Sequence, residues 1–234
     1  MGEKTLPVSE IFYSIDGEGA RTGAPAIFIR LFGCNLDCSY CDSIYACRQT
    51  DSGTPFKTMT IDEIVLAAET FAPCKCVTLT GGEPLIHKNA AELVDKLRYA
   101  GFWVNIETNG SIDLAEFTSQ LDIPDKKSAM DYFFTMDWKS ISSNECSRMK
   151  SSNLEFLEAN DVLKFVVADE ADLNQMKELL EKYPDIDAQI YVSPVWGKIT
   201  PDKIVEYVLN NQLVYVKVQI QLHKIIWSPD RRGV

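Results

Sequence analysis

The stretch that decides the fold is Arg30-Leu31-Phe32-Gly33-Cys34-Asn35-Leu36-Asp37-Cys38-Ser39-Tyr40-Cys41-Asp42-Ser43, which overlaps the end of an apolar run at residues 25–32. Its three cysteines are close enough in sequence for three thiolates to converge on one compact inorganic centre. Thiolates favour zinc, copper(I) or iron–sulfur clusters over harder cations. A structural zinc site needs four closed ligands, and no second cysteine or histidine pair follows at zinc-finger spacing. Iron–sulfur clusters usually take four cysteines, so a cluster held by only these three would leave one iron open.

Composition and charge narrow the class of protein. Apolar residues at 46% suffice for a core, and the length of 234 residues favours a single α/β domain over residues 1–234. The formal net charge of −11 repels phosphate backbones, which argues against a nucleic-acid partner. No apolar run approaches a membrane span in length, so no membrane partner is expected. The seven cysteines and the absence of an apolar export signal predict a cytoplasmic protein with reduced thiols.

Strands and helices alternate along most of the chain. Apolar runs predict seven strands, at residues 25–32, 77–80, 102–106, 132–136, 162–167, 189–192 and 214–222. Between them we expect helices that begin near residue 60 and span about residues 85–100, 113–120, 155–160, 171–183 and 201–210, with a polar linker at 122–127. Thr60 and Glu63 have the spacing of a capping box. The alternation predicts a mostly parallel sheet with covering helices, here a partial, open α/β barrel.

Polar motifs directly follow four of the predicted strands. They are the cysteine loop, Gly81-Gly82-Glu83-Pro84, Glu107-Thr108-Asn109-Gly110 and Asp137-Trp138-Lys139. Ligands of parallel α/β folds gather at the carboxyl ends of the strands, so we expect these motifs to share one site. Taken singly, each of the later motifs also fits an ordinary turn between a strand and a helix.

The cysteine spacing, with Tyr40 before the last cysteine, resembles the signature of the radical S-adenosylmethionine (SAM) superfamily. The resemblance implies a 4Fe–4S cluster on Cys34, Cys38 and Cys41, whose fourth iron chelates SAM. It also implies that the Gly-Gly-Glu-Pro element binds the methionyl amino group of SAM. The full set of implied SAM contacts is Tyr40, Gly81, Gly82, Glu83, Glu107, Asn109, Lys139 and Ser142.

The N-terminal loop narrows the resemblance further. The chain is similar to the 7-carboxy-7-deazaguanine synthase family at Phe12-x-Ser14-Ile15-Asp16-Gly17-Glu18-Gly19. Near the C-terminus it is similar to the same family at Gln221-x-His223-Lys224 and Pro229. This implies a lyase that converts 6-carboxy-5,6,7,8-tetrahydropterin into 7-carboxy-7-deazaguanine and ammonia, in queuosine or another 7-deazapurine pathway. Ser43 is then expected to bind Mg2+ with substrate oxygens, which suits a hard cation that keeps its waters. Implied substrate contacts are Asp16, Gly17, Glu18, Arg30, Thr80, Gly82, His223 and Pro229.

The chemistry of two side chains suits a pterin acid. Glu18 can accept hydrogen bonds from two adjacent ring N–H groups, and Arg30 can clamp a carboxylate with its planar fork. Asp16 departs from the family, which commonly has glutamine there, and residues 230–234 extend beyond Pro229. Cys47 and three other cysteines match no cluster position and are expected to be small buried side chains.

Two alternatives stay open at this point. An activase for a glycyl-radical enzyme has the same cysteine spacing but acts on a protein partner. An iron–sulfur electron-transfer module without SAM chemistry has no use for the motifs at residues 81–84 and 107–110. For the lyase, the resemblance further implies a small-molecule pterin substrate, a homodimer, and a reductant such as a flavodoxin or ferredoxin.

Overall fold

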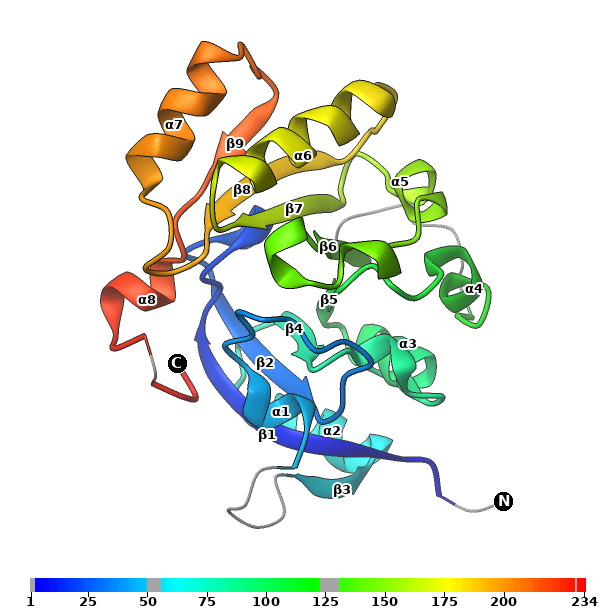
Figure 1. Cartoon of the computed structure of the whole chain (residues 1–234). Coiled ribbons are helices and arrows are strands. Elements are labelled where there is room, and N and C mark those ends of the chain that lie inside the picture. The colour runs from blue at the N-terminus through cyan, green and yellow to red at the C-terminus, as the bar shows by residue number, and fades with distance from the viewer. Residues whose placement is uncertain (1–2, 50–55, 123–130, 230) are drawn as a thin grey trace.

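The computed structural model of the chain describes residues 3–49, 56–122, 131–229 and 231–234. Within them one nine-stranded sheet has the strand order β3-β1-β2-β4-β5-β6-β7-β8-β9 (Figure 1). Neighbouring strands from β2 to β9 are parallel, as predicted for a mostly parallel α/β fold. These seven strands are β2 (Pro25–Leu31), β4 (Cys76–Gly81), β5 (Trp103–Thr108), β6 (Tyr132–Trp138), β7 (Val162–Val167), β8 (Gln189–Pro194) and β9 (Val216–Val218).

Two further strands, which were not predicted, widen the sheet beyond β2. Strand β1 (Thr5–Ile15) pairs antiparallel with β2, and β3 (Lys57–Thr60) pairs antiparallel with β1. Only Leu6 and Val8 of β1 are fully buried, so this strand lacks the continuous apolar run that marks the central strands. With β1 on one side and β4 on the other, β2 and the start of the cysteine loop are fixed from both sides.

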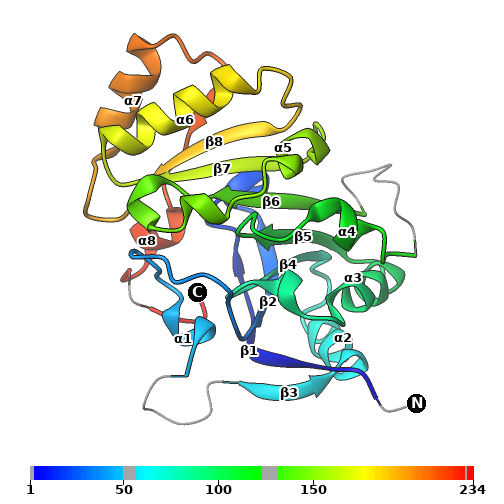
Figure 2. The ribbon, with the colours of Figure 1, turned by 45° about the vertical axis from the view of Figure 1, so that its right-hand side comes forward.

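The helices divide between the two faces of the curved sheet, as Figure 2 shows. The outer face carries α2 (Ile61–Glu69), α3 (Ala90–Tyr99), α4 (Leu114–Thr118), α5 (Ser152–Phe156), α6 (Glu170–Lys182) and α7 (Pro201–Asn210). The short helices α1 (Ile44–Cys47) and α8 (Leu222–Ile226) lie together with the C-terminal end on the opposite side. The predicted helix over residues 85–100 is shorter than expected, because a 3-10 turn at Pro84–Ile86 precedes α3. The helix predicted at 155–160 begins earlier, at Ser152.

Local sequence explains where the helices begin. Thr60 Oγ1 accepts a hydrogen bond from the Glu63 amide at 3.2 Å, and Glu63 Oε2 accepts from the Thr60 amide at 2.8 Å, so the predicted capping box is confirmed. Asp169 caps α6 in the same position by accepting from the Asp172 amide at 3.1 Å. The predicted linker at residues 122–127 lies largely outside the described residues.

The parallel strands carry apolar side chains on one face and polar side chains on the other. Leu79, Ile106 and Leu163 belong to the hydrophobic core, which includes residues of the outer helices such as Leu93 and Met176. Buried polar residues alternate with them along the strands, namely Thr78, Thr80, Asn105, Thr135 and Lys164. Because successive side chains of a strand point to opposite faces, the polar set lines the inside of the curved sheet.

The ends of the curved sheet approach each other through loops. The Gly19 amide donates to Gln219 Oε1 at 2.7 Å, and the Leu222 amide donates to the Gly17 carbonyl at 3.0 Å. These contacts explain why the strand predicted at residues 214–222 ends at Val218. The chain leaves the sheet there to meet the loop after β1. The two edge strands β3 and β9 have no ladder to each other, so the predicted open barrel is confirmed.

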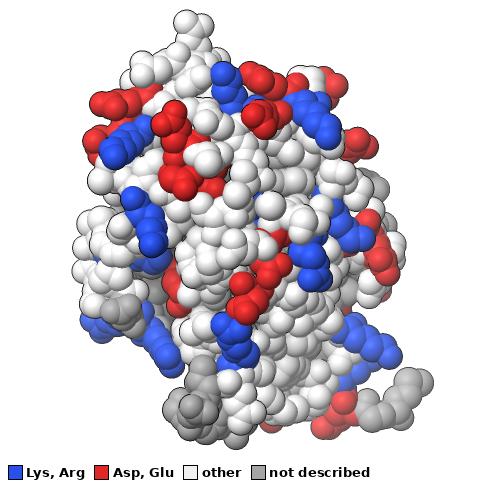
Figure 3. Space-filling view, in the orientation of Figure 1, with Lys and Arg blue, Asp and Glu red and all other residues white. Residues whose placement is uncertain are grey.

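The molecular surface mixes charges of both signs. In Figure 3, Lys and Arg side chains lie among Asp and Glu side chains, so the net charge of −11 does not form one acidic surface on this face. None of the described helices has the length and apolar character needed to cross a membrane.

Candidate active site

One cavity of about 1160 Å³ brings nearly all predicted site residues together at the carboxyl ends of the parallel strands. Its walls come from the loop after β1, the cysteine loop, the ends of β4 to β7, and the chain around and after α8. Two predicted residues, Glu83 and Ser142, are not among its lining residues. Those that line it are Asp16, Gly17, Glu18, Arg30, Cys34, Cys38, Tyr40, Cys41, Ser43, Thr80, Gly81, Gly82, Glu107, Asn109, Lys139, His223 and Pro229.

The cysteine loop follows β2 and presents three thiols to the cavity. Gly33 starts the loop with φ of +108°, and its amide donates to the Ala46 carbonyl at 2.7 Å, which holds α1 against the loop. In the described part of the chain, no three His, Cys, Asp or Glu side chains are close enough to hold a single metal ion. A 4Fe–4S cluster with one open iron would instead take one thiolate on each of its other three irons. Cysteines spread over one cavity wall fit that cluster.

Cys47 brings a fourth thiol to this wall. Its Sγ atom lies 3.7 Å from Cys41 Sγ, and it also contacts Cys34. The hydrogen bond from Cys47 lowers the pKa of Cys34 to about 6 and that of Cys41 to about 7, against the opposing effect of burial. Cys47 is therefore more than the small buried side chain that the sequence predicted, because it touches two of the predicted cluster ligands.

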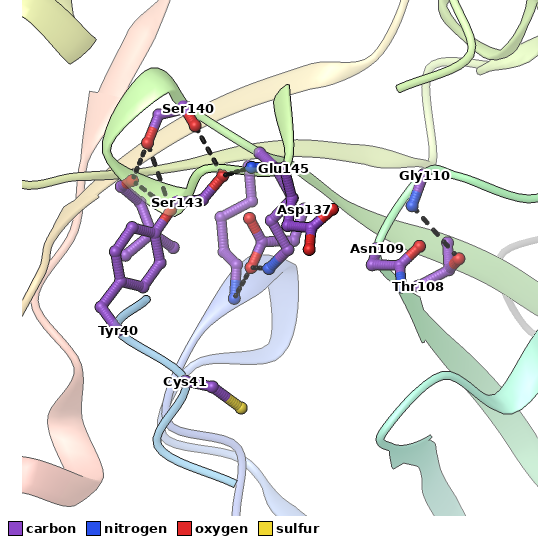
Figure 4. A network of polar contacts seen from close by, with 12 residues as sticks. Tyr40, Cys41, Thr108, Asn109, Gly110, Asp137, Ser140, Ser143 and Glu145 are labelled. Atoms are coloured by element: carbon purple, nitrogen blue, oxygen red, sulfur yellow. Dashed lines mark hydrogen bonds and ion pairs between the residues drawn. The ribbon is translucent and has the colours of Figure 1, made fainter. Parts of the chain in front are cut away.

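Tyr40 ties the cysteine loop to the far side of the cavity. Its hydroxyl lies 3.1 Å from Ser140 Oγ and donates to the Val166 carbonyl at 3.3 Å (Figure 4). The neighbouring Ser39 hydroxyl donates to the Ser142 carbonyl. The Ser142 amide in turn donates to Asp172 Oδ1 at 3.0 Å, so the described polar contacts of Ser142 hold loops together outside the cavity.

The two glycines after β4 are needed for packing against the cysteine loop. A Cβ atom on Gly81 would lie 2.1 Å from the Leu31 carbonyl oxygen, and one on Gly82 would lie 2.2 Å from the Gly33 carbonyl oxygen. The family resemblance implies that both glycines also contact SAM. The structure shows that the backbone they admit is that of the loop carrying the cysteines.

Glu83, an implied SAM contact, is fully buried and accepts hydrogen bonds from three groups of its own chain. Its Oε1 atom accepts hydrogen bonds from the Leu85 amide at 2.9 Å and from Thr108 Oγ1 at 3.0 Å. Its Oε2 atom accepts from the Asn109 amide at 2.6 Å. Burial raises the pKa of Glu83 to about 7, although these hydrogen bonds oppose the shift. Glu83 thus joins the loop after β4 to the loop after β5.

The Asn109 side chain connects the loop after β5 to the cysteine loop. Its Nδ2 atom donates to Asn35 Oδ1 at 3.1 Å and lies 3.8 Å from Cys34 Sγ. Its Oδ1 atom accepts from the Ser111 hydroxyl at 2.6 Å and from the Ser111 amide at 3.0 Å. These contacts hold three strand ends in one arrangement around the cavity.

A buried group of charges lines the inner face of the sheet. Lys164 Nζ lies 3.1 Å from Glu18 Oε2 and 3.9 Å from Asp137 Oδ2, and Lys139 Nζ lies 2.9 Å from the same Asp137 oxygen. The other carboxylate oxygen of Glu18 and that of Asp137 are buried and have no hydrogen-bond partner within the described residues. Glu107 also lines the cavity near this group. Lys164 was not predicted as a site residue.

Asp16, the departure from the family, has protein partners for both carboxylate oxygens. Oδ2 accepts from Arg21 Nε at 2.9 Å, and Oδ1 accepts from Thr78 Oγ1 at 2.9 Å. Arg21 also donates to the Val77 carbonyl at 2.8 Å. Burial raises the pKa of Asp16 to about 6 in spite of the Arg21 charge. Asp16 therefore fixes the base of the cavity.

Glu10 of β1 holds the Arg30 guanidinium by an ion pair. Arg30 Nε donates to Glu10 Oε1 at 2.7 Å, and the Tyr45 hydroxyl donates to the same oxygen at 2.7 Å. The Arg232 guanidinium lies 3.9 Å from the centre of the Tyr45 ring, and it also lines the cavity. Since Glu10 engages Nε, a ligand carboxylate would meet the Nη groups of Arg30.

The C-terminal segment supplies the remaining wall. The His223 ring packs on Gly17, where a Cβ atom would lie 2.1 Å from Nδ1. Lys224 Nζ lies 2.7 Å from Asp42 Oδ2, and the Ser43 hydroxyl donates to Asp42 Oδ1 at 3.0 Å. Burial lowers the pKa of His223, which favours the neutral imidazole. Asp42 thus connects α8 to the residue predicted to bind Mg2+.

Comparisons with known proteins agree with this arrangement. The model of the Radical SAM superfamily matches residues 28–122. The chain is 41% identical to the 7-carboxy-7-deazaguanine synthase of Clostridium acetobutylicum over 97% of this chain and 98% of the relative. It is 38% identical to that of Methanospirillum hungatei, covering 96% of this chain and 86% of the relative. The crystal structure of QueE from Escherichia coli has the same fold, with a TM-score of 0.73 and 24% identity over 94% of this chain and 95% of that one.

The relatives are similar over nearly the whole chain, and the matched superfamily segment contains the cysteine loop and the motifs after β4 and β5. The chain belongs to the 7-carboxy-7-deazaguanine synthase family of radical SAM enzymes.

Proposed function

We propose that this protein is a radical SAM lyase that converts 6-carboxy-5,6,7,8-tetrahydropterin into 7-carboxy-7-deazaguanine and ammonia, for queuosine or another 7-deazapurine. The observation that carries the proposal is the shared cavity. It is lined by the three cysteines, by the motifs after β4, β5 and β6, and by the acid, arginine and histidine expected for a pterin acid. When bound and reduced, the cluster and SAM supply a 5′-deoxyadenosyl radical that removes hydrogen from C6 of the pterin. The work of the protein is to hold C6 in reach and exclude water.

The cluster and SAM would be held by the wall built on β2, β4, β5 and β6. Cys34, Cys38 and Cys41 would each bind one iron. SAM would be contacted from the strand ends by backbone groups of Gly81 and Gly82. It would also meet the side chains of Glu107, Asn109, Lys139 and Tyr40. Glu83 and Ser142 would support this wall from behind, since neither lines the cavity.

The pterin acid would be held by the loop after β1 and the C-terminal segment. Glu18 Oε1, which has no partner in the described part of the chain, can accept from the amino and amide edge of the ring. Arg30 would bind the substrate carboxylate through its Nη groups, and neutral His223 can donate to or accept from a ring atom. Gly17, Thr80, Gly82 and Pro229 would complete the shape of the pocket, with Asp16 fixing its base.

Mg2+ would bind at Ser43 with substrate oxygens and water. Hydroxyl, carboxylate and water oxygens are the ligands this hard cation prefers. The Asp42 carboxylate, which contacts both Ser43 and Lys224, would keep the serine hydroxyl in place.

The proposal extends to the domain organisation, the cellular location, the reductant and the oligomeric state. One continuous sheet supports a single domain over residues 1–234. Cysteines that must stay reduced to hold the cluster support a cytoplasmic location, and the chemistry needs a one-electron reductant such as a flavodoxin or ferredoxin. We also propose a homodimer, as the family resemblance implies. A glycyl-radical activase or an electron-transfer module would leave Glu18, Arg30 and His223 without a role.

An anaerobic turnover assay tests the proposal. Protein reconstituted with iron and sulfide is given the tetrahydropterin acid, SAM and dithionite, with and without Mg2+. We expect 7-carboxy-7-deazaguanine by absorbance and mass, in amounts that Mg2+ increases. Cleavage of SAM to 5′-deoxyadenosine without any change in the pterin would instead support an activase, and no SAM cleavage would support an electron-transfer module.

A further inference from the structure

Lys164 is a single cation in an otherwise apolar strand. Strand β7 reads Val-Leu-Lys-Phe-Val-Val, and all six residues are buried. A buried ammonium is costly unless it is paired, so its partners carry information about its purpose. They are two carboxylates from different parts of the chain, Glu18 in the loop after β1 and Asp137 at the end of β6.

Each of these carboxylates uses one oxygen for lysine and leaves the other unpaired. Glu18 Oε2 and Asp137 Oδ2 face Lys164 Nζ at 3.1 and 3.9 Å, whereas Glu18 Oε1 and Asp137 Oδ1 are buried without a partner among the described residues. Buried acceptors without a donor are rare, because each keeps the full cost of its lost hydration. Both side chains line the cavity, so the two free oxygens are suited to ligand donors.

The surrounding charges make the lysine necessary. Around Lys164 are Glu18 from the loop after β1, Glu107 from β5, Asp137 from β6 and Lys139 directly after β6. His223 from α8 also faces Glu18. Without Lys164, Lys139 would be the ammonium left beside Glu18 and Asp137, while the charge of Arg30 acts on Glu107. Repulsion between like charges favours protonation of one of these carboxylates, which would turn an acceptor into a donor.

We propose that Lys164 is a positioning residue shared by the two ligands. It fixes Glu18 so that Oε1 accepts from the amino and amide edge of the pterin, and it fixes Asp137 so that Oδ1 accepts from a hydroxyl or amino group of SAM. The inference rests on the proposed function. It adds a physical link between the pterin and SAM sites, which lie on different strands but depend on one ammonium group.

The test compares Lys164→Met with Lys164→Arg in the reconstituted full-length protein. Lys177→Met serves as a control, because Lys177 lies on α6 and contacts Glu181 of the same helix and Asn211, which directly follows α7. Melting temperature and iron content show whether each variant folds and holds the cluster. SAM affinity is measured from the change that SAM causes in the EPR spectrum of the reduced cluster, and the pterin KM from turnover.

We expect Lys164→Met to raise the pterin KM and the SAM dissociation constant by about 10-fold or more each, as for loss of a hydrogen bond to a charged group. Lys164→Arg should restore most of both, and Lys177→Met should change neither. In a Glu18→Gln background, adding Lys164→Met should change the pterin KM less than twofold while still weakening SAM binding. If Lys164 were purely structural, the effects of Lys164→Met and Glu18→Gln on the pterin KM would add.

Unchanged affinities in Lys164→Met, or fully additive effects with Glu18→Gln, would overturn the inference. Should Lys164→Met fail to fold, Lys164→Gln takes its place with the same expected changes. The EPR measurement of SAM binding needs no pterin turnover. An inactive wild-type protein would therefore reject the proposed function while the effect of Lys164→Met on SAM affinity still decides the role of Lys164.

Discussion

Glu83 gives the sharpest contrast between a motif and its structure. The Gly-Gly-Glu-Pro resemblance implies that Glu83 contacts SAM, whereas the structure shows a fully buried carboxylate with three donors from its own chain. In Glu83→Gln, an amide NH2 group replaces one carboxylate oxygen and keeps the shape of the side chain. Because Leu85, Thr108 and Asn109 all donate to Glu83, the new NH2 group must face at least one of these donors.

The size of the effect follows from the donors. The least costly orientation places the new NH2 group against the Asn109 amide, which loses the Glu83 acceptor, while Oε1 keeps the Leu85 and Thr108 bonds. One buried amide without an acceptor costs about 1–3 kcal/mol. For a domain of this length, each kcal/mol lowers the melting temperature by about 2–4 °C. We therefore expect a melting temperature roughly 2–12 °C lower than that of the wild type.

The assay is thermal unfolding of the anaerobic protein, followed by SAM binding well below the melting temperature. Glu92→Gln is the matched control, since Glu92 lies on α3 and pairs with Lys4 at the surface. It should unfold within about 1–2 °C of the wild type, because exposed ion pairs contribute little. A Glu83→Gln protein of wild-type stability that fails to bind SAM would refute this reasoning and restore the direct contact implied by the motif.

Three further perturbations test other parts of the site. Burial raises the pKa of Asp16 from 3.8 to about 6, so the stabilisation that its protonated form gives is present below about pH 4 and is lost as the pH rises through 6. Asp16→Asn should remove this pH dependence, which amounts to up to about 3 kcal/mol of the free energy of unfolding. Urea unfolding at several pH values measures it. Glu18→Gln should raise the pterin KM about 10-fold or more and leave 5′-deoxyadenosine formation intact, so an unchanged KM would remove Glu18 from the pocket. Ser43→Ala should raise the Mg2+ concentration needed for half-maximal turnover and leave SAM affinity unchanged; equal Mg2+ curves would contradict its role.

The parallel sheet could be predicted from sequence because buried strands are continuous apolar runs. The runs at Cys76–Gly81 and Val162–Val167 have almost no exposed residue. Strand β1 has few buried positions and borders the sheet through antiparallel pairing, so periodicity gave no comparable signal. The strand predicted at 214–222 was too long, because Gln219 leaves the sheet to bind the loop at Gly19 and Thr22.

The candidate site could be predicted wherever residues stand next to one another in sequence at the end of a strand. The cysteine loop and the motif at Glu107 are such cases, and both line the cavity. The environment of a buried acid cannot be derived in this way, since two of the donors to Glu83, Thr108 and Asn109, lie about 25 residues further along the chain. Lys164 has no neighbouring motif. The one sequence signal for it is an isolated charge in a strand that is otherwise apolar.

The central claim is that three cysteines hold the cluster and leave one iron for SAM, although a fourth thiol lies nearby. Cys47 Sγ is 3.7 Å from Cys41 Sγ, so a spectroscopic test on its variant is the most direct one. Iron content and the EPR spectrum, with and without SAM, should be compared for wild type, Cys47→Ala and Cys38→Ala after anaerobic reconstitution. We predict about four irons per chain and a SAM-dependent spectrum for wild type and Cys47→Ala, and no intact cluster for Cys38→Ala. Loss of the cluster in Cys47→Ala, or a wild-type spectrum that SAM leaves unchanged, would contradict the account.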